Sequence, residues 1–184
     1  MLQVFLLLTF LISCKKKYEG DVRYLPEDWD NVTLVDSNNQ SFSLSNLRGK
    51  HKVIYFGFSH CPDMCPMALT NLSQALLILG PKANKLESVF ITLDPDRDSP
   101  DQMKRYIEMF KGQKFIALTP TNDSLDKLFA TFNIRREKKE NGNSYTFDHS
   151  NFIFFIGEKN EQIATYPGST TPETLAKELR ELLP

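Results

Sequence analysis

The sequence predicts a single α/β domain, because strand-like and helix-like segments alternate along most of its 184 residues. Two continuous apolar runs, residues 53–58 and 88–93, are typical of strands buried on both faces of a sheet. Each is followed by apolar residues at helical spacing. A hairpin pattern over residues 151–166 and a last helix from residue 171 come after them. This order predicts a central mixed sheet with helices on both sides, as in a thioredoxin-like fold.

Composition agrees with a folded domain and excludes some partners. Apolar residues make up 41% of the chain and charged residues 24%, which is ordinary for a globular protein. The net charge is −1, with acids and bases interspersed. Because no basic stripe could displace counterions from a phosphate backbone, nucleic acid is not an expected partner.

The N-terminus predicts export and a membrane anchor. Residues 1–13 are nearly all apolar, but the run is shorter than the roughly 20 residues that span a bilayer, so we expect a signal peptide. Residues 11–14 (LISC) resemble a bacterial lipobox, in which Cys14 is acylated; an ordinary signal peptide or a trimmed membrane anchor are the alternatives. We therefore expect the domain, residues 28–184, in the bacterial cell envelope outside the cytoplasm, joined to the membrane by a polar tether over residues 15–27.

The first half of the domain begins with a hairpin. Residues 32–35 and 41–44 flank the turn-forming residues 36–39 (DSNN), which predicts two short antiparallel strands. A short turn over residues 44–48 then ends at Gly49. The strand at residues 53–58 (VIYFGF) leads to a helix with Pro66 in its first turn, which continues to Gly80.

The second half repeats the strand and helix pattern. The strand at residues 88–93 (SVFITL) precedes a helix that begins at Ser99 and Pro100. Residues 115–118 are predicted to form a short strand and residues 123–132 a short helix. The apolar hairpin pairs residues 151–156 with residues 162–166, and a helix opening at Thr171 completes the fold.

Cys61 and Cys65 follow the first buried strand, at the carboxyl end where α/β sheets place their ligand sites. A helix N-terminus beyond Cys65 favours the thiolate form. Three interpretations are open: a structural disulfide, which would stabilise little across so short a loop; thiol exchange, although thioredoxins place two residues rather than three between their cysteines; and a metal site.

A metal site would gain from a third ligand with nitrogen, and the chain has three histidines. His51 lies in a charged turn and is most simply solvated, whereas His60 is next to Cys61 and could ligate or pack. His149 precedes the apolar strand at residue 151, so it is a candidate ligand whose ring Asp148 could orient, or else a surface histidine. Soft thiolates select Cu(I), and imidazole binds copper in both oxidation states.

Three motifs resemble the Sco/SenC family of copper proteins: residues 55–66 (YFGFSHCPDMCP), residues 92–98 (TLDPDRD) and the pair Asp148 and His149. They occur in family order, and the similarity spans roughly residues 30–183. The resemblance implies a thioredoxin-like fold and copper bound by Cys61, Cys65 and His149. It also implies a role in assembling the dinuclear copper centre of cytochrome c oxidase.

Asp94 and Asp98 end the second buried strand near the same edge of the sheet. They could shape a docking surface for a partner or help to hold the copper loop. The alternative is a solvated turn, in which Asp98 or Ser99 caps the next helix.

The leading hypothesis is a metallochaperone that binds Cu(I), with Cu(II) as a second candidate, and transfers it to the copper-accepting subunit of cytochrome c oxidase. An exported cysteine pair can oxidise, so a thiol reductant protein is expected as a second partner. The rival hypothesis is a thiol–disulfide oxidoreductase, in which Cys61 attacks and Cys65 resolves. A copper- or redox-sensing protein is a third, weaker interpretation.

Overall fold

The structure is a computed structural model that describes residues 22–110 and 114–184. The expected signal peptide, Cys14 and the first part of the expected tether lie outside the described residues. Within the described ranges, no helix combines the length and the apolar character needed to cross a membrane.

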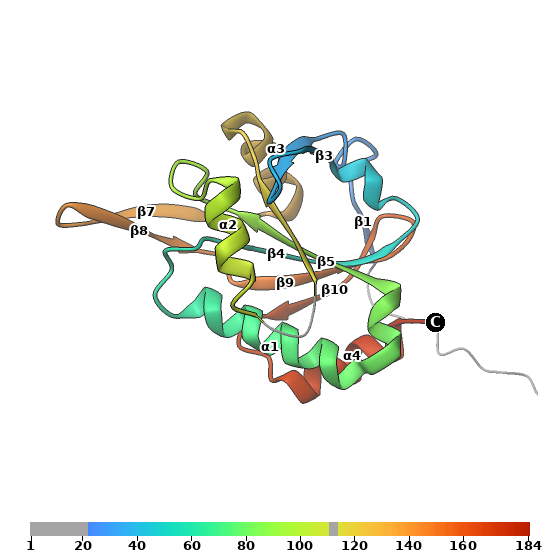
Figure 1. The fold of residues 1–184 in the computed structure, drawn as a ribbon. Coiled ribbons are helices and arrows are strands. Elements are labelled where there is room, and N and C mark those ends of the chain that lie inside the picture. The colour runs from blue at the N-terminus through green and yellow to red at the C-terminus, as the bar shows by residue number, and fades with distance from the viewer. Residues whose placement is uncertain (1–21, 111–113) are drawn as a thin grey trace, which may run out of the picture.

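Most strands belong to one eight-stranded sheet, with the order β1-β10-β9-β4-β5-β6-β2-β3 (Figure 1). Its strands are β1 (Arg23–Tyr24), β2 (Thr33–Asp36), β3 (Ser41–Ser43), β4 (His51–Gly57), β5 (Leu86–Thr92), β6 (Phe115–Thr119), β9 (Phe152–Ile156) and β10 (Glu161–Pro167). A separate two-stranded sheet consists of β7 (Arg136–Asn141) and β8 (Ser144–His149). The helices are α1 (Met64–Leu79), α2 (Pro100–Ile107), α3 (Asn122–Phe132) and α4 (Pro172–Leu182), with short 3-10 helices η1 (Leu44–Leu47) and η2 (Gly80–Lys85).

The large sheet is mixed, as predicted. Strands β4, β5 and β6 are parallel, whereas β9 runs antiparallel to β4 on its other side. Helix α1 connects β4 to β5, and α2 connects β5 to β6. The carboxyl ends of the parallel strands therefore meet at one edge of the sheet, where the cysteine motif begins.

Burial on both faces explains why β4 is continuously apolar. Val53 and Tyr55 pack in a core with residues of α1, α2 and α4, while Ile54 and Phe56 pack on the opposite face with α3 and the N-terminal segment. Figure 1 shows α1 and α4 side by side on one side of the sheet and α3 on the other.

Two differences from the sequence prediction concern segments outside the continuous apolar runs. Residues 23 and 24, expected in the tether, form β1 and pair with β10, and Leu25 is only 6% exposed, so the folded domain begins earlier than residue 28. The hairpin of β7 and β8 was not predicted. It projects beyond the large sheet in Figure 1, and residues 136–140 are exposed.

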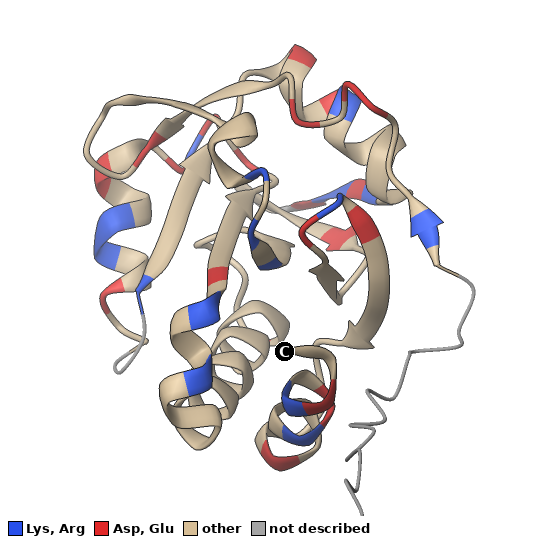
Figure 2. Ribbon diagram, turned by 90° about the vertical axis from the view of Figure 1, so that its right-hand side faces the viewer, with Lys and Arg blue, Asp and Glu red and all other residues tan. Residues whose placement is uncertain are grey.

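Acidic and basic side chains are interspersed over the described part of the chain. Figure 2 shows Lys and Arg alongside Asp and Glu on α4 and on the connecting segments, whereas α1 contains no charged residue. In α4, for example, both signs occur on neighbouring turns.

Candidate metal centre

The cysteine motif spans the junction between β4 and α1. Strand β4 ends at Gly57 and α1 begins at Met64, two residues before the proline that was expected in its first turn. Cys65 therefore lies inside the first turn of the helix, whereas Cys61 remains in the preceding loop. The side chain of the N-cap residue, Asp63, makes no capping hydrogen bond.

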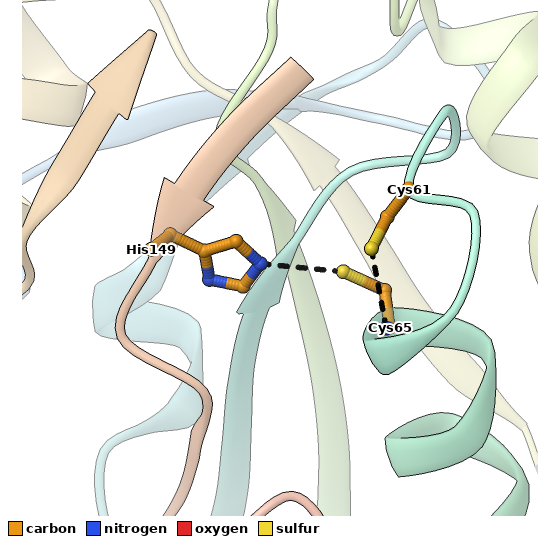
Figure 3. Close-up of side chains that lie close together, drawn as sticks. All are labelled: Cys61, Cys65 and His149. Carbon is orange, nitrogen blue, oxygen red and sulfur yellow. Dashed lines mark hydrogen bonds between the residues drawn. The ribbon is translucent and has the colours of Figure 1, made fainter. Parts of the chain in front are cut away.

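The sulfur of Cys61 takes the place of that cap. The backbone N–H of Cys65 donates to Cys61 Sγ at 3.4 Å (Figure 3). Backbone N–H groups in the first turn of a helix lack intrahelical acceptors and carry partial positive charge. The sulfur thus satisfies one of these donors, and the helix end favours its thiolate form.

The two cysteines ionise in opposite ways. The pKa of Cys61 falls from 9.0 to about 4, mainly through its hydrogen bond with the Cys65 side chain, with help from His149 and the backbone of Asp63, and against the effect of burial. The same hydrogen bond, burial and the negative charge of Cys61 raise the pKa of Cys65. The metal-free pair at neutral pH is accordingly one thiolate and one thiol.

His149 is the last residue of β8, and its ring faces the cysteine pair. Nε2 lies 3.4 Å from Cys65 Sγ, and Nδ1 lies 2.9 Å from the carbonyl oxygen of Ser150. Because a carbonyl oxygen only accepts, this second contact requires a proton on Nδ1, which leaves the Nε2 lone pair of the neutral ring free for a metal. The ring also packs edge-on against Phe58, with centroids 5.7 Å apart.

The three side chains converge as the sequence predicted. The two sulfurs and one imidazole nitrogen lie within 4.8 Å of one another (Figure 3). Cys65 is fully buried, while Cys61 and His149 are partly buried. Two sulfurs and a nitrogen in this arrangement can hold a single soft metal ion.

The prediction that Asp148 orients the His149 ring is wrong. Asp148 is exposed and lies opposite Glu137 in the β7–β8 ladder, and both ring nitrogens of His149 have other contacts. The Ser150 carbonyl does the orienting instead. The other two histidines lie apart from the ligand group: His51 pairs with Glu158 at 3.3 Å, and His60 Nδ1 lies 3.4 Å from Asp98 Oδ1.

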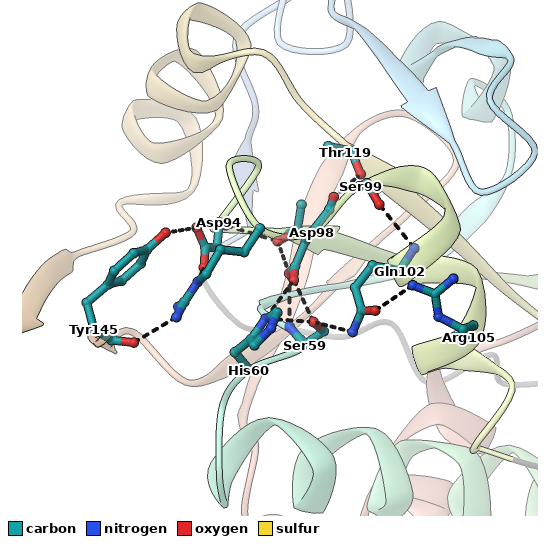
Figure 4. A network of polar contacts seen from close by, with 11 residues as sticks. Ser59, His60, Asp94, Asp98, Ser99, Gln102, Arg105, Thr119 and Tyr145 are labelled. Atoms are coloured by element: carbon teal, nitrogen blue, oxygen red, sulfur yellow. Dashed lines mark hydrogen bonds and ion pairs between the residues drawn. The ribbon is translucent and has the colours of Figure 1, made fainter. Parts of the chain in front are cut away.

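Asp98 binds Ser59, in the loop that leads to Cys61. Its carboxylate accepts the backbone N–H of Ser59 at 2.9 Å, the Ser59 hydroxyl at 2.6 Å and the Thr92 hydroxyl at 2.5 Å (Figure 4). The side chain is fully buried, so this carboxylate joins the end of β5 to the residues just before Cys61. Ser99 caps α2 by accepting from the N–H of Gln102.

Asp94 fixes the strand that carries His149. Its carboxylate accepts the Tyr145 hydroxyl at 2.9 Å and Arg97 Nε at 2.5 Å, and the Arg97 guanidinium donates to the Tyr145 carbonyl and stacks 3.6 Å from its ring (Figure 4). Asp94 is 1% exposed. Both aspartates therefore support the two segments of the site, and their burial leaves them unable to form a docking surface themselves.

Arg97, Tyr145 and Ser59 were missed by the sequence interpretation. One signal was present: Tyr145, Phe147 and His149 alternate with period two, which indicates one face of a strand. In the structure Phe147 packs edge-on against Phe58, the ring that also contacts His149.

We expect Asp98→Asn to loosen the cysteine loop. An amide presents one acceptor oxygen where the carboxylate presents two, so at least one buried donor loses its partner, at a cost of about 1.5–3 kcal/mol in the free energy of unfolding. Chemical denaturation measures this loss, and amide hydrogen exchange at Ser59 should accelerate. Asp96→Asn is the matched control, because Asp96 is exposed in the same turn. Equal stability and equal Ser59 protection in the two variants would contradict the assignment.

Comparison with known proteins gives consistent matches. A family model described as SCO1/SenC matches residues 29–184. A SCO2-like protein of Rickettsia prowazekii is 38% identical over 153 residues, which cover 81% of this chain and 72% of the relative. The structure of Bradyrhizobium japonicum ScoI with copper bound matches with a TM-score of 0.75 at 30% identity, over 83% of this chain and 97% of ScoI.

Yeast Sco1 with copper bound matches with a TM-score of 0.72 at 31% identity, over 82% of this chain and 84% of that structure. These structural matches and the mixed sheet confirm the predicted thioredoxin-like fold. The predicted family resemblance is confirmed as well, and the chain belongs to the SCO1/SenC family.

Proposed function

We propose that Cys61, Cys65 and His149 bind one copper ion, which the protein delivers to the dinuclear copper centre of cytochrome c oxidase. The observation that carries the copper site is the approach of two sulfurs and an imidazole nitrogen to within 4.8 Å of one another. Delivery to the oxidase is supported by the family to which the chain belongs.

Copper suits this set of donors. Thiolates prefer Cu(I) among the common ions, and an imidazole nitrogen also serves Cu(II). Structural zinc sites use four protein ligands, so three donors do not form a closed structural zinc site. The solved relatives ScoI and Sco1 contain copper, at 30% and 31% identity to this chain.

Three protein ligands leave room for transfer. A cysteine of the copper-accepting subunit can enter the coordination sphere beside Cys61 and His149, which are both partly buried rather than enclosed. Protein ligands then leave one at a time, so copper passes between proteins without becoming a bare ion. Cys65, which is fully buried, would be the last protein ligand to dissociate from the copper ion.

The thiolate that binds copper also makes the metal-free site sensitive to oxidation. Cys61 lies beside Cys65, and an exported domain meets an environment that permits disulfides. A Cys61–Cys65 disulfide no longer provides thiolates, so a thiol reductant protein is the second partner in this proposal. The proposal also places the domain outside the cytoplasm and holds it at the membrane through an acyl chain on Cys14.

A second candidate is thiol–disulfide exchange with the copper acceptor, and the ionised Cys61 favours it. In the first step the Cys61 thiolate attacks an acceptor disulfide, and one acceptor thiolate leaves. The Cys65 thiol then passes its proton to the released acceptor thiolate and attacks the Cys61 sulfur, which releases the second acceptor thiolate and closes the Cys61–Cys65 disulfide. Two electrons pass to the acceptor, and His149 takes no part.

Replacement of the histidine separates these functions. His149→Ala removes the nitrogen ligand, so we expect the reduced protein to lose stoichiometric copper in a titration followed by absorption, while reduction of a model disulfide survives. His51→Ala is the control, since His51 lies at the start of β4, away from the cysteines. Full copper binding by His149→Ala would remove the proposed site.

The ionisation of Cys61 predicts a reactivity profile. Because its pKa is about 4 instead of 9.0, the reduced metal-free protein holds a thiolate over most of the accessible pH range. Alkylation of Cys61 by iodoacetamide, measured by mass spectrometry, should stay nearly constant from pH 9 down to about pH 5 and then fall roughly tenfold for each unit below the pKa. Cys65, whose pKa is raised, should react slowly throughout. A Cys61 profile that follows an ordinary thiol would refute this ionisation state.

A further inference from the structure

A buried tyrosine packs in the core close to Cys65. Tyr55 belongs to β4 and its side chain is fully buried. The hydroxyl donates to Asn151 Oδ1 at 2.9 Å, and the Tyr55 ring packs in the same core cluster as Cys65. In the metal-free protein the hydroxyl proton therefore points at an amide oxygen, and a sulfur of the proposed metal centre belongs to the same core cluster.

Gly57 makes this approach possible. A Cβ atom at Gly57 would lie 2.9 Å from Cys65 Sγ and 3.0 Å from Cε1 of Tyr55. Ordinary Cβ atoms do not come so close to their neighbours. The missing side chain allows the sulfur and the tyrosine ring to meet over the backbone of β4, and it explains a glycine within a strand of bulky residues.

Hydrogen bonds to a metal-bound thiolate change its properties as a ligand. A donor that points at the sulfur stabilises its negative charge and thereby alters metal affinity and reduction potential. The surroundings of the Cys65 side chain are largely apolar, because Cys65 belongs to a core cluster with Phe58, Leu69 and Phe90. In such surroundings a hydroxyl donor has a large effect.

The geometry points to Tyr55 as a positioning residue for the copper complex: its hydroxyl turns from Asn151 Oδ1 to Cys65 Sγ and holds the sulfur by a hydrogen bond. This inference rests on the proposed copper site and specifies how the site selects an oxidation state. The sulfur keeps more negative charge when bound to Cu(I) than to Cu(II), which draws more electron density from it. The hydrogen bond therefore stabilises the Cu(I) complex more.

Tyr106 provides a matched control. It is 5% exposed and lies in the same core cluster as Tyr55 and Cys65. Its hydroxyl oxygen is buried and has no hydrogen-bond partner among the described residues. Removing the Tyr106 hydroxyl therefore makes the same chemical change near the site without removing a hydrogen bond.

The test compares Tyr55→Phe with Tyr106→Phe in the reduced full-length protein. Cu(I) is titrated against a chelator of known affinity, Cu(II) is titrated alone, and the sulfur-to-Cu(II) absorption band is recorded. We expect Tyr55→Phe to keep one copper, to lose roughly tenfold in Cu(I) affinity and less in Cu(II) affinity, and to shift the band to longer wavelength. Tyr106→Phe should match the unaltered protein.

Asn151→Ala distinguishes this role from a merely structural one. It frees the Tyr55 hydroxyl for the sulfur, so the band should move to shorter wavelength and Cu(I) should bind more tightly, opposite to Tyr55→Phe. The inference is overturned if Tyr55→Phe has the band and the Cu(I)-to-Cu(II) affinity ratio of the unaltered protein, or if both variants shift the same way. Absence of copper binding by the unaltered protein would overturn the proposed function and this inference together.

Discussion

Two buried carboxylates hold together the segments that carry Cys61, Cys65 and His149. The Cys65 sulfur and the His149 nitrogen come from residues 84 positions apart, so the site exists only if separate parts of the fold are fixed to each other. Asp98 binds the loop before Cys61, and Asp94 binds Arg97 and Tyr145 on the side of the hairpin. A buried charge without partners is costly, but each of these carboxylates accepts hydrogen bonds from several donors. The turn between β5 and α2, which carries both aspartates, therefore connects the two segments of the site.

The contacts of this turn also allow the site to be rigid at Cys65 and accessible at Cys61 and His149. Helix α1 begins at the cysteine motif and gives Cys61 a stabilised thiolate, while the sulfur of Cys65 is enclosed by the core. The hairpin that carries His149 pairs only with itself as a sheet and is held by the polar contacts of Asp94 and by aromatic packing on Phe58. The proposed transfer of copper needs this combination of a fixed inner ligand and outer ligands that an acceptor can approach.

The sequence predicted those parts of the fold that carry a strong apolar period and missed those that do not. Strands β4 and β5 are buried on both faces, and the cysteine pair was correctly placed at the end of the first of them. By contrast, residues 136–140 of β7 are charged and exposed, and within the described part of the chain this strand pairs with β8 alone. The Ser150 carbonyl, which orients His149 in place of Asp148, is a backbone group, and no side-chain pattern reveals a backbone acceptor. The cap of α1 was hidden for a related reason, since a cysteine sulfur rather than Asp63 accepts the hydrogen bond.

X-ray absorption spectroscopy of the reduced protein loaded with one equivalent of Cu(I) tests the central claim most directly, because it counts the atoms bound to the metal. The structure predicts two sulfur neighbours and one imidazole nitrogen around each copper ion. A copper environment with a single sulfur, or with no imidazole contribution, would contradict the convergence of Cys61, Cys65 and His149 on one ion.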